Sequence, residues 1–256
     1  MGDVISDMVS NYYSGSSGLL LPVPNKLHYP EAFQDKPRMV YYGALYNSIE
    51  VNSSFYKIPR AVTLQKWAAL VPEDFEFSFK LFKGISHSKG LDFEPQVVAD
   101  FMSALNGVGD KKGCLLIQFP PSVGHQLDKI HALLSIVQEH NLGKRWKVAV
   151  EFRNNVLYRP EVYTLLAEHD AGMVLHDKQV APSPLLDTHP DFVYLRFHGP
   201  DGNYRSSYDE TILAEYASYI IDWMAQGKKV YAYFNNTMGS ALENLQCLCS
   251  LVKSEG

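Results

Sequence analysis

Short apolar runs alternate along the chain with polar loops and with amphipathic segments of helical period. Eight of these runs have the usual length of a β-strand, are rich in β-branched or aromatic residues, and end at turn signals. They span residues 9–14, 48–52, 76–81, 113–119, 147–153, 172–176, 192–198 and 229–235. Apolar stripes typical of one helix face lie between them, in 61–70 and 126–141 and after Pro95, Pro160, Ser207 and Ser240.

This alternation favours parallel strands joined by helical crossovers. Eight strands in a chain of 256 residues predict one TIM-type (β/α)8 barrel domain over residues 1–256. An open doubly wound sheet is the alternative, but the glycine-rich GxGxxG turn that usually follows its first strand is absent from the sequence. Residues 15–36 and 178–191 contain several prolines and no helical pattern, so we expect one or two irregular crossovers.

Composition narrows the function classes. A net charge of −5 gives no global reason to expect a nucleic acid or an anionic membrane as partner. No run approaches the ~20 apolar residues of a membrane span. Cys114, Cys247 and Cys249 show neither a disulfide framework nor the spacing of a zinc site. We therefore expect a soluble cytoplasmic protein without a membrane partner, and the oligomeric state stays open.

The parity of each strand predicts which side chains enter the barrel. Alternate residues face the helices and the interior, and the continuously apolar set belongs with the helices. In 147–153 this rule directs Glu151 and Arg153 inward, above Ala149. Applied to the other strands, it gives inward polar residues that gather at the carboxyl ends, where barrel active sites lie. The set is Glu50, Asn52, Lys80, Gln118, Glu151, Arg153, His176, Arg196, His198 and Asn235.

The charges of this set indicate its chemistry. Two carboxylates face three fixed cations, so we expect a net positive mouth and an anionic ligand. The guanidinium forks of Arg153 and Arg196 suit phosphate or carboxylate oxygens. A carboxylate as general base and a histidine as general acid would serve acid–base catalysis. A structural ion pair between Glu151 and one of these arginines remains the alternative for that residue.

Several motifs resemble the bacterial YecE-like proteins, the domain-of-unknown-function 72 family. The matching stretches are SIEVNSSFYKIPR (48–60), FEFSFKLFKGISH (75–87), LLIQFPPS (115–122), VAVEFR (148–153), VLHD (174–177), YLRFHG (194–199) and YAYFNNT (231–237). The resemblance implies a TIM-type barrel with a polar mouth, and the family has no securely assigned reaction. It adds Phe55, Tyr56, His87, Asp177, Gly199 and Asn236 to the candidate site. The segments Gly15–Leu19 and Asn154–Leu157 depart from the family pattern, because aromatic residues and a histidine are missing there.

Three functions are consistent with these observations. The leading hypothesis is an enzyme acting by acid–base chemistry on a small anionic or sugar-like substrate, with lyase, isomerase and hydrolase reactions open. Its predicted catalytic residues are Glu50, Glu151, His176, Asp177 and His198. Its predicted substrate-binding residues are Asn52, Tyr56, Lys80, His87, Gln118, Arg153, Arg196, Asn235 and Asn236.

The other two hypotheses differ in class. A divalent metal held by histidines and carboxylates would give a metal-assisted hydrolase, whose substrate could be a nucleic acid. No HxH or HExxH spacing occurs in the sequence, and we predict no cofactor. A binding module for a phosphorylated metabolite or single-stranded nucleic acid would stack bases on tyrosines. The tyrosines considered for that role are Tyr12, Tyr13, Tyr56, Tyr194, Tyr204 and Tyr233.

Overall fold

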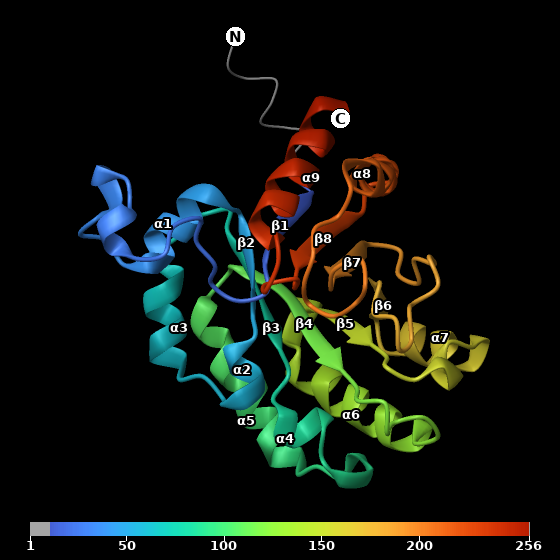
Figure 1. Ribbon diagram of the computed structural model, residues 1–256. Coiled ribbons are helices and arrows are strands. Elements are labelled where there is room, and N and C mark those ends of the chain that lie inside the picture. Colours follow the sequence, from blue (N-terminus) through green and yellow to red (C-terminus); the bar gives the residue numbers. More distant parts are fainter. Residues whose placement is uncertain (1–10, 256) are drawn as a thin grey trace.

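The computed structural model describes residues 11–255 and contains eight parallel strands in a nearly closed barrel (Figure 1). The predicted TIM-type barrel is therefore confirmed. The strands are β1 (Tyr12–Ser16), β2 (Ser48–Val51), β3 (Glu76–Lys80), β4 (Lys112–Gln118), β5 (Lys147–Glu151), β6 (Ala171–His176), β7 (Phe192–Phe197) and β8 (Lys229–Phe234). Each matches a predicted run, although β1 begins later than expected, and residues 9 and 10 of that run lie outside the described range.

Helices surround the strands (Figure 1). They are α1 (Arg38–Leu45), α2 (Ser53–Tyr56), α3 (Ala61–Ala68), α4 (Lys83–Ser86), α5 (Pro95–Leu105), α6 (Leu127–His140), α7 (Pro160–Glu168), α8 (Glu210–Ala225) and α9 (Ala241–Glu255). The sequence pattern did not predict α1, α2 or α4, and the last two, with four residues each, are too short for a periodic stripe. The crossover from β6 to β7 contains no helix, as its prolines predicted. No helix in residues 11–255 is long and apolar enough to cross a membrane.

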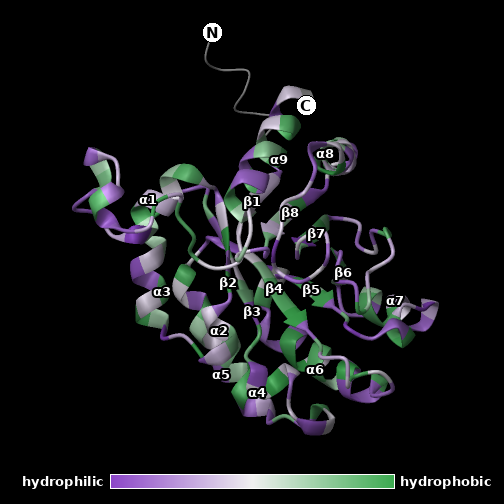
Figure 2. Ribbon diagram, viewed as in Figure 1, coloured by the Kyte–Doolittle hydropathy of each residue, from purple (hydrophilic) through white to green (hydrophobic). Residues whose placement is uncertain are grey.

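The core has two layers, and they confirm the predicted parity. The outward side chains of the strands pack against the helices, as Val148, Val150 and Phe152 of the fifth strand and its extension show. The inward side chains form a separate buried cluster within the barrel, made of Cys114, Leu116, Ala149, Val174, Phe192, Tyr194, Tyr231 and Tyr233. Helices in Figure 2 alternate between hydrophobic and hydrophilic stretches along their length. The buried cluster within the barrel supports the polar ends of the strands above it.

The barrel closes between β1 and β2 through side chains more than through backbone pairing. The strand order runs from β1 through β8 and down to β2. In the described chain, β1 and β2 are joined by one isolated bridge between Ser17 and Glu50. The side chain of Asn47 connects the two edges, because it accepts from Ser14 N at 2.9 Å and donates to the Tyr12 carbonyl at 2.7 Å. We call this junction the β1–β2 seam.

Tyr42 adds a second side-chain connection to the seam. Its hydroxyl accepts from Ser16 N at 2.9 Å and donates to the Ser48 carbonyl at 3.1 Å. Gly15 lies at the tightest point, where a Cβ atom would stand 2.0 Å from the Ser48 carbonyl oxygen. This close approach of the two strands therefore requires a glycine at position 15.

Replacing Gly15 by alanine is expected to lower the free energy of unfolding by about 3 kcal/mol, because the seam must open to admit the methyl group. Urea unfolding measures the loss. Gly18→Ala is the control, since no atom lies within 4 Å of its added carbon and only its φ of +95° opposes the change, at about 1–2 kcal/mol. Equal losses in the two variants would show that the seam is not tightly closed.

Candidate functional site

Arg196 is the centre of the polar mouth. It lies near the end of β7, is 2% exposed, and bridges carboxylates from two other strands. Its Nε and Nη2 donate to both oxygens of Glu50, at 2.8 and 2.7 Å, in a bidentate pair. Its Nη1 donates to Glu151 Oε2 at 2.6 Å. One guanidinium thus holds two fully buried carboxylates, an arrangement that is favourable only when each charge has its partners.

The surroundings of Glu50 keep it ionised. Burial alone would raise its pKa, but the charge of Arg196 and hydrogen bonds from Arg196, Ser17 and Tyr194 shift the pKa below the usual value. Ser17, just after β1, donates from Oγ at 2.6 Å, and Tyr194 of β7 donates from its hydroxyl at 2.7 Å. Ser17 was not among the predicted site residues, and Tyr194 had been considered only as a stacking residue for bases, although its inward parity indicated that its side chain enters the barrel.

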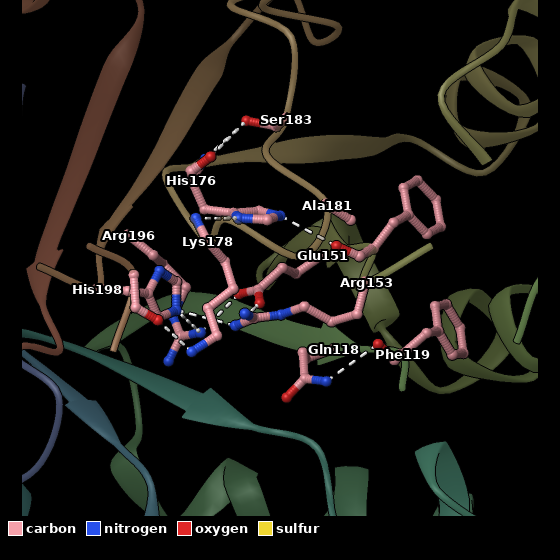
Figure 3. A network of polar contacts seen from close by, with 12 residues as sticks. Gln118, Phe119, Glu151, Arg153, His176, Lys178, Ala181, Ser183, Arg196 and His198 are labelled. Carbon is pink, nitrogen blue, oxygen red and sulfur yellow. Dashed lines mark hydrogen bonds and ion pairs between the residues drawn. The ribbon is translucent and has the colours of Figure 1, made fainter. Parts of the chain in front are cut away.

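Glu151 and Arg153 form an ion pair inside the mouth (Figure 3). Burial opposes the charge of Glu151, but Arg196 and then Arg153 hold its pKa well below the usual value. Both residues were predicted to point inward, and they do so. The ion pair between them, which the sequence left open as an alternative, is present together with the contact from Glu151 to Arg196.

His198 is held as a neutral imidazole. Its Nε2 lies 2.9 Å from Arg153 Nη2 and 3.1 Å from Arg196 Nη1, and because both guanidiniums are donors, this nitrogen must accept. The other ring nitrogen, Nδ1, therefore carries the proton and donates to Asp177 at 3.2 Å. Burial, reinforced by the arginines, lowers the pKa of His198 to about 4. Its predicted role as a general acid stays a prediction, and both of its ring nitrogens are already engaged.

Asp177 follows β6 and fixes the strand end that carries His198. Besides the imidazole, it accepts from the backbone N–H of His198 at 2.8 Å and from the Tyr208 hydroxyl. The same Tyr208 oxygen accepts from Gly199 N at 2.6 Å. Sequence reasoning missed Tyr208, because it lies in a loop beyond the motif that ends at Gly199. Asp177 thus joins the loop after β6 to the loop after β7, and its predicted catalytic role stays a prediction.

His176 lies at the end of β6 with both nitrogens hydrogen-bonded. Its Nδ1 accepts from Lys178 N at 3.2 Å, so Nε2 carries the proton and faces the Phe152 carbonyl and the Tyr158 hydroxyl oxygen, each at 3.0 Å. Figure 3 shows the ring beside the group formed by Glu151, Arg153, Arg196 and His198. The imidazole connects the ends of two neighbouring strands, and its predicted acid role also stays a prediction.

A small cavity of about 190 Å³ lies in the mouth. It is lined by Asn52, Phe55, Tyr56, Lys80, Arg196, Tyr204 and Asn235. Five of these seven were predicted as substrate-binding residues, and Phe55 came with the family resemblance. Tyr204 had been considered only as a stacking residue for bases. The five predicted catalytic residues do not line this cavity. Glu50, Glu151 and His198 are buried and contact Arg196, Asp177 contacts His198, and His176 is bonded to neighbouring loops.

Lys80 brings an amine into the cavity from the end of β3. Its Nζ donates to Gln118 Oε1 at 2.8 Å and lies 4.3 Å from the centre of the Phe55 ring. Burial, together with the nearby Arg196, lowers the pKa of this amine to about 8. Gln118 was predicted as a binding residue, and its observed contact is with Lys80.

The remaining predicted binding residues, His87, Asn235 and Asn236, differ in how close they lie to the cavity. His87 packs edge-on against Phe55 with ring centres 4.9 Å apart, and burial lowers the pKa of its imidazole to about 4. Asn235 lines the cavity, but the adjacent Asn236 is fully buried and donates to Asn244 Oδ1 at 3.0 Å. Asn236 therefore ties β8 to α9 and lies outside the cavity lining.

The charge balance of the mouth differs from the one predicted. Asp177 joins Glu50 and Glu151, so three carboxylates accompany the three cations, and the expected net positive ring was wrong. The two arginines are paired with carboxylates. Within residues 11–255, Lys80 has no carboxylate at ion-pair distance. The positive charge available to a ligand is therefore concentrated at Lys80.

The segments that depart from the family pattern have local structural roles. Ser17 contributes the hydrogen bond to Glu50, and Asn154 caps a short 3₁₀ turn by accepting from Val156 N at 3.2 Å. Asn154 also donates to the Pro121 carbonyl at 2.9 Å, which joins the loops after β4 and β5.

The family predicted from the motifs is confirmed by a family model described as protein of unknown function DUF72, which matches residues 17–256. The chain belongs to the DUF72 family. Among its relatives, UPF0759 protein YunF of Bacillus subtilis (strain 168) is 26% identical over 258 residues, covering 89% of this chain and 90% of that protein. UPF0759 protein YecE of Escherichia coli (strain K12) is 28% identical over 104 residues, 40% of this chain and 38% of that protein.

Solved structures of this family share the fold. A DUF72 family protein of Thermotoga maritima (TM1631) superposes with a TM-score of 0.76 at 24% identity, covering 94% of this chain and 99% of that one. A DUF72 family protein of Enterococcus faecalis (EF0366) gives a TM-score of 0.78 at 21% identity, covering 94% and 95%. At these identities the likeness concerns the barrel alone.

Proposed function

We propose that this DUF72 protein is an enzyme that binds a small anionic, hydroxylated substrate in the mouth cavity and acts on it by acid–base chemistry. The observation that carries the proposal is Lys80, a partly buried amine without a carboxylate partner in the described chain, facing a cavity of about 190 Å³. A buried cation of this kind is stabilised when an anion supplies the missing charge. The amine also has a pKa of about 8, near enough to neutral pH to exchange a proton.

The other lining groups support a polar, hydroxylated substrate. Asn52 has a side-chain oxygen that is buried and accepts no hydrogen bond within the described residues, so a ligand hydroxyl would complete it. Asn235, just after β8, and Tyr204, in the loop after β7, add polar groups to the cavity lining. Drug-sized ligands fill pockets of ~300–1,000 Å³, so this cavity suits a compound of only a few carbon atoms.

In this proposal the predicted carboxylates act through Arg196. Glu50 and Glu151 occupy its three guanidinium nitrogens and fix its plane at the floor of the mouth. They are thus positioning residues, and Lys80 is the group that touches the substrate. The network pre-organises the site before the ligand enters, which lowers the ordering cost of binding.

Calorimetric titration with glycerol 3-phosphate, inorganic phosphate and uncharged glycerol tests the proposal. We expect both anions to bind, glycerol not to bind, and Lys80→Met to weaken anion binding by about 10–100-fold, the worth of a charged hydrogen bond. Lys89→Met, at an exposed lysine outside the cavity lining, is the matched control and should leave binding unchanged. Anion binding that survives Lys80→Met at full strength would overturn the assignment. Turnover of small phosphorylated sugars, followed by NMR, should be lost in the same variant.

The metal-assisted alternative finds less support in the donor set. Among the described residues, no three side chains of histidine, cysteine, aspartate or glutamate gather into a group that could hold a metal ion. The Nε2 lone pair of His198 is directed at two arginines, and the oxygens of Glu50 and Glu151 face cations. A metal ion at this position would have to displace those guanidiniums, so we favour the metal-free arrangement as the resting form.

A further inference from the structure

Lys80 has surroundings that change the reactivity of its amine as well as its charge. The side chain passes over the Phe55 ring, and Nζ makes one neutral hydrogen bond, to Gln118 Oε1 at 2.8 Å. The amine lines the same small cavity as Arg196 and Tyr204. It is therefore partly shielded from bulk water, near a second cation, and open to a bound ligand.

These surroundings favour the neutral amine, which is the nucleophilic form. Lysine amines are activated when they are desolvated or placed beside another cationic group, and Lys80 is a partly buried amine in the same cavity as Arg196. Burial is the larger cause of the low pKa of Lys80, about 8, and Arg196 and Arg153 reinforce it against Glu151 and Glu50. Compared with an ordinary exposed lysine, a shift of this size enlarges the neutral fraction at pH 7.5 on the order of 100-fold.

We propose that Lys80 is a covalent catalyst that forms an imine with the carbonyl carbon of a small anionic aldehyde or ketone bound in the mouth cavity. The proposal rests on the proposed function and names its substrate class. The neutral Nζ adds to the carbonyl carbon and gives a carbinolamine, with one proton passing from nitrogen to oxygen. The hydroxyl then leaves as water, taking a proton from solvent, and the C=N bond forms as an iminium ion. No oxidant or reductant is consumed.

The cavity gives such an adduct the contacts it needs. Asn52 offers an acceptor without a partner among residues 11–255 for a hydroxyl next to the carbonyl, and the Asn235 amide and the Tyr204 hydroxyl line the cavity as donors for the anionic group. Gln118 holds Nζ by a single hydrogen bond, which the amine can exchange for the bond to carbon. His87 lies in the loop region after β3, and its Nε2 is 3.5 Å from the amide nitrogen of Gln118.

Reductive trapping tests the imine on the full chain. The protein is incubated at pH 7.5 with dihydroxyacetone phosphate or pyruvate and sodium cyanoborohydride, which delivers hydride to the imine carbon and leaves a stable secondary amine. Peptide mass spectrometry should locate a mass increase equal to the carbonyl compound less one oxygen atom at Lys80. We expect labelling at Lys80 to exceed that at Lys83 at least about 10-fold, given the larger neutral fraction. Lys83 is exposed beside the same mouth, with Nζ 5.5 Å from the centre of the Tyr56 ring.

Two further results separate this proposal from the one on which it rests. Lys80→Arg keeps the cation, so it should still bind glycerol 3-phosphate but should lose the trapped adduct. Glycerol 3-phosphate, which has no carbonyl group, should compete with trapping in the wild type. Anion binding without preferential labelling of Lys80 by either carbonyl compound would overturn the imine and leave the proposed function standing. Loss of both binding and labelling in the wild type would overturn both.

Discussion

Replacing Arg196 by methionine is expected to lower the free energy of unfolding by about 3–5 kcal/mol. The substitution keeps most of the side-chain volume but leaves Glu50 and Glu151 fully buried without their shared guanidinium. Each carboxylate then loses strong charged hydrogen bonds and repels the other across the mouth. Urea unfolding at pH 7, compared by the free energy extrapolated to water, measures the loss.

The control and the rescue make this expectation specific. Arg145→Met removes the exposed ion pair with Asp110, whose side chains are 53% and 84% exposed, and should cost less than about 1 kcal/mol. Combining Arg196→Met with Glu50→Gln should recover part of the loss, because the neutral glutamine side chain no longer needs a counter-charge, whereas Glu151 keeps its ion pair with Arg153. A single Arg196→Met variant as stable as the wild type would show that the mouth is hydrated and that the ion pairs are dispensable.

Acidification from pH 6.5 to pH 4 is expected to destabilise the protein through His198 by up to about 3 kcal/mol. The folded pKa of this histidine, about 4, lies below the ordinary value, so the unfolded chain binds more protons across this window. The stability is fully present above the unfolded pKa and is lost as the pH falls towards the folded one. Burial and the two arginines that face Nε2 lower this pKa. A proton on Nε2 would need a hydrogen-bond acceptor, and the two arginines that occupy that position are donors.

The measurement compares the pH dependence of the wild type with that of His198→Gln, which retains an oxygen that can accept from the arginines. Stability curves from urea unfolding at several pH values should converge between pH 6.5 and 4, because the variant lacks the titrating group. Groups with lowered pKa values that do not contact His198, such as His87, contribute equally to both proteins and cancel in the difference. Parallel curves would contradict the assignment of His198 as a neutral imidazole whose pKa is lowered in the folded protein.

The period of the strands predicted the barrel and the inward direction of the polar residues, because alternation follows directly from strand geometry. Glu151 and Arg153 are the clearest case. Asn235 and Asn236 separate the two sources of prediction. β8 ends at Phe234, and of the two asparagines that follow, one lines the cavity and the other is buried against α9. The period had directed Asn235 inward, whereas Asn236 was added to the mouth by the family resemblance alone, which carries no information about the direction of a side chain.

The layering of the mouth could not be predicted from the strands alone. Tyr208 clamps Asp177, and Tyr204 lines the cavity with a φ of +69°, an uncommon backbone conformation for a tyrosine. Both belong to the loop after β7, whose course depends on tertiary hydrogen bonds such as the one from Met238 N to the Tyr204 carbonyl at 3.0 Å. Which residues touch a ligand and which support those residues is decided by such contacts, and these have no signature in local sequence.

The β1–β2 seam has a consequence for the order in which the chain folds. The backbone ladder of β1 is with β8, from Tyr12 opposite Val230 to Ser16 opposite Phe234, so its main partner is far away in the sequence. Before β8 is in place, β1 meets β2 through the Ser17–Glu50 bridge and the side chains of the seam, and closing so large a loop is slow. The half-barrel from β2 to β7 can assemble earlier through neighbouring strands. The hydrogen bond from Ser17, just after β1, to Glu50 would then form late, so the final step of folding also completes the hydrogen bonds of the mouth.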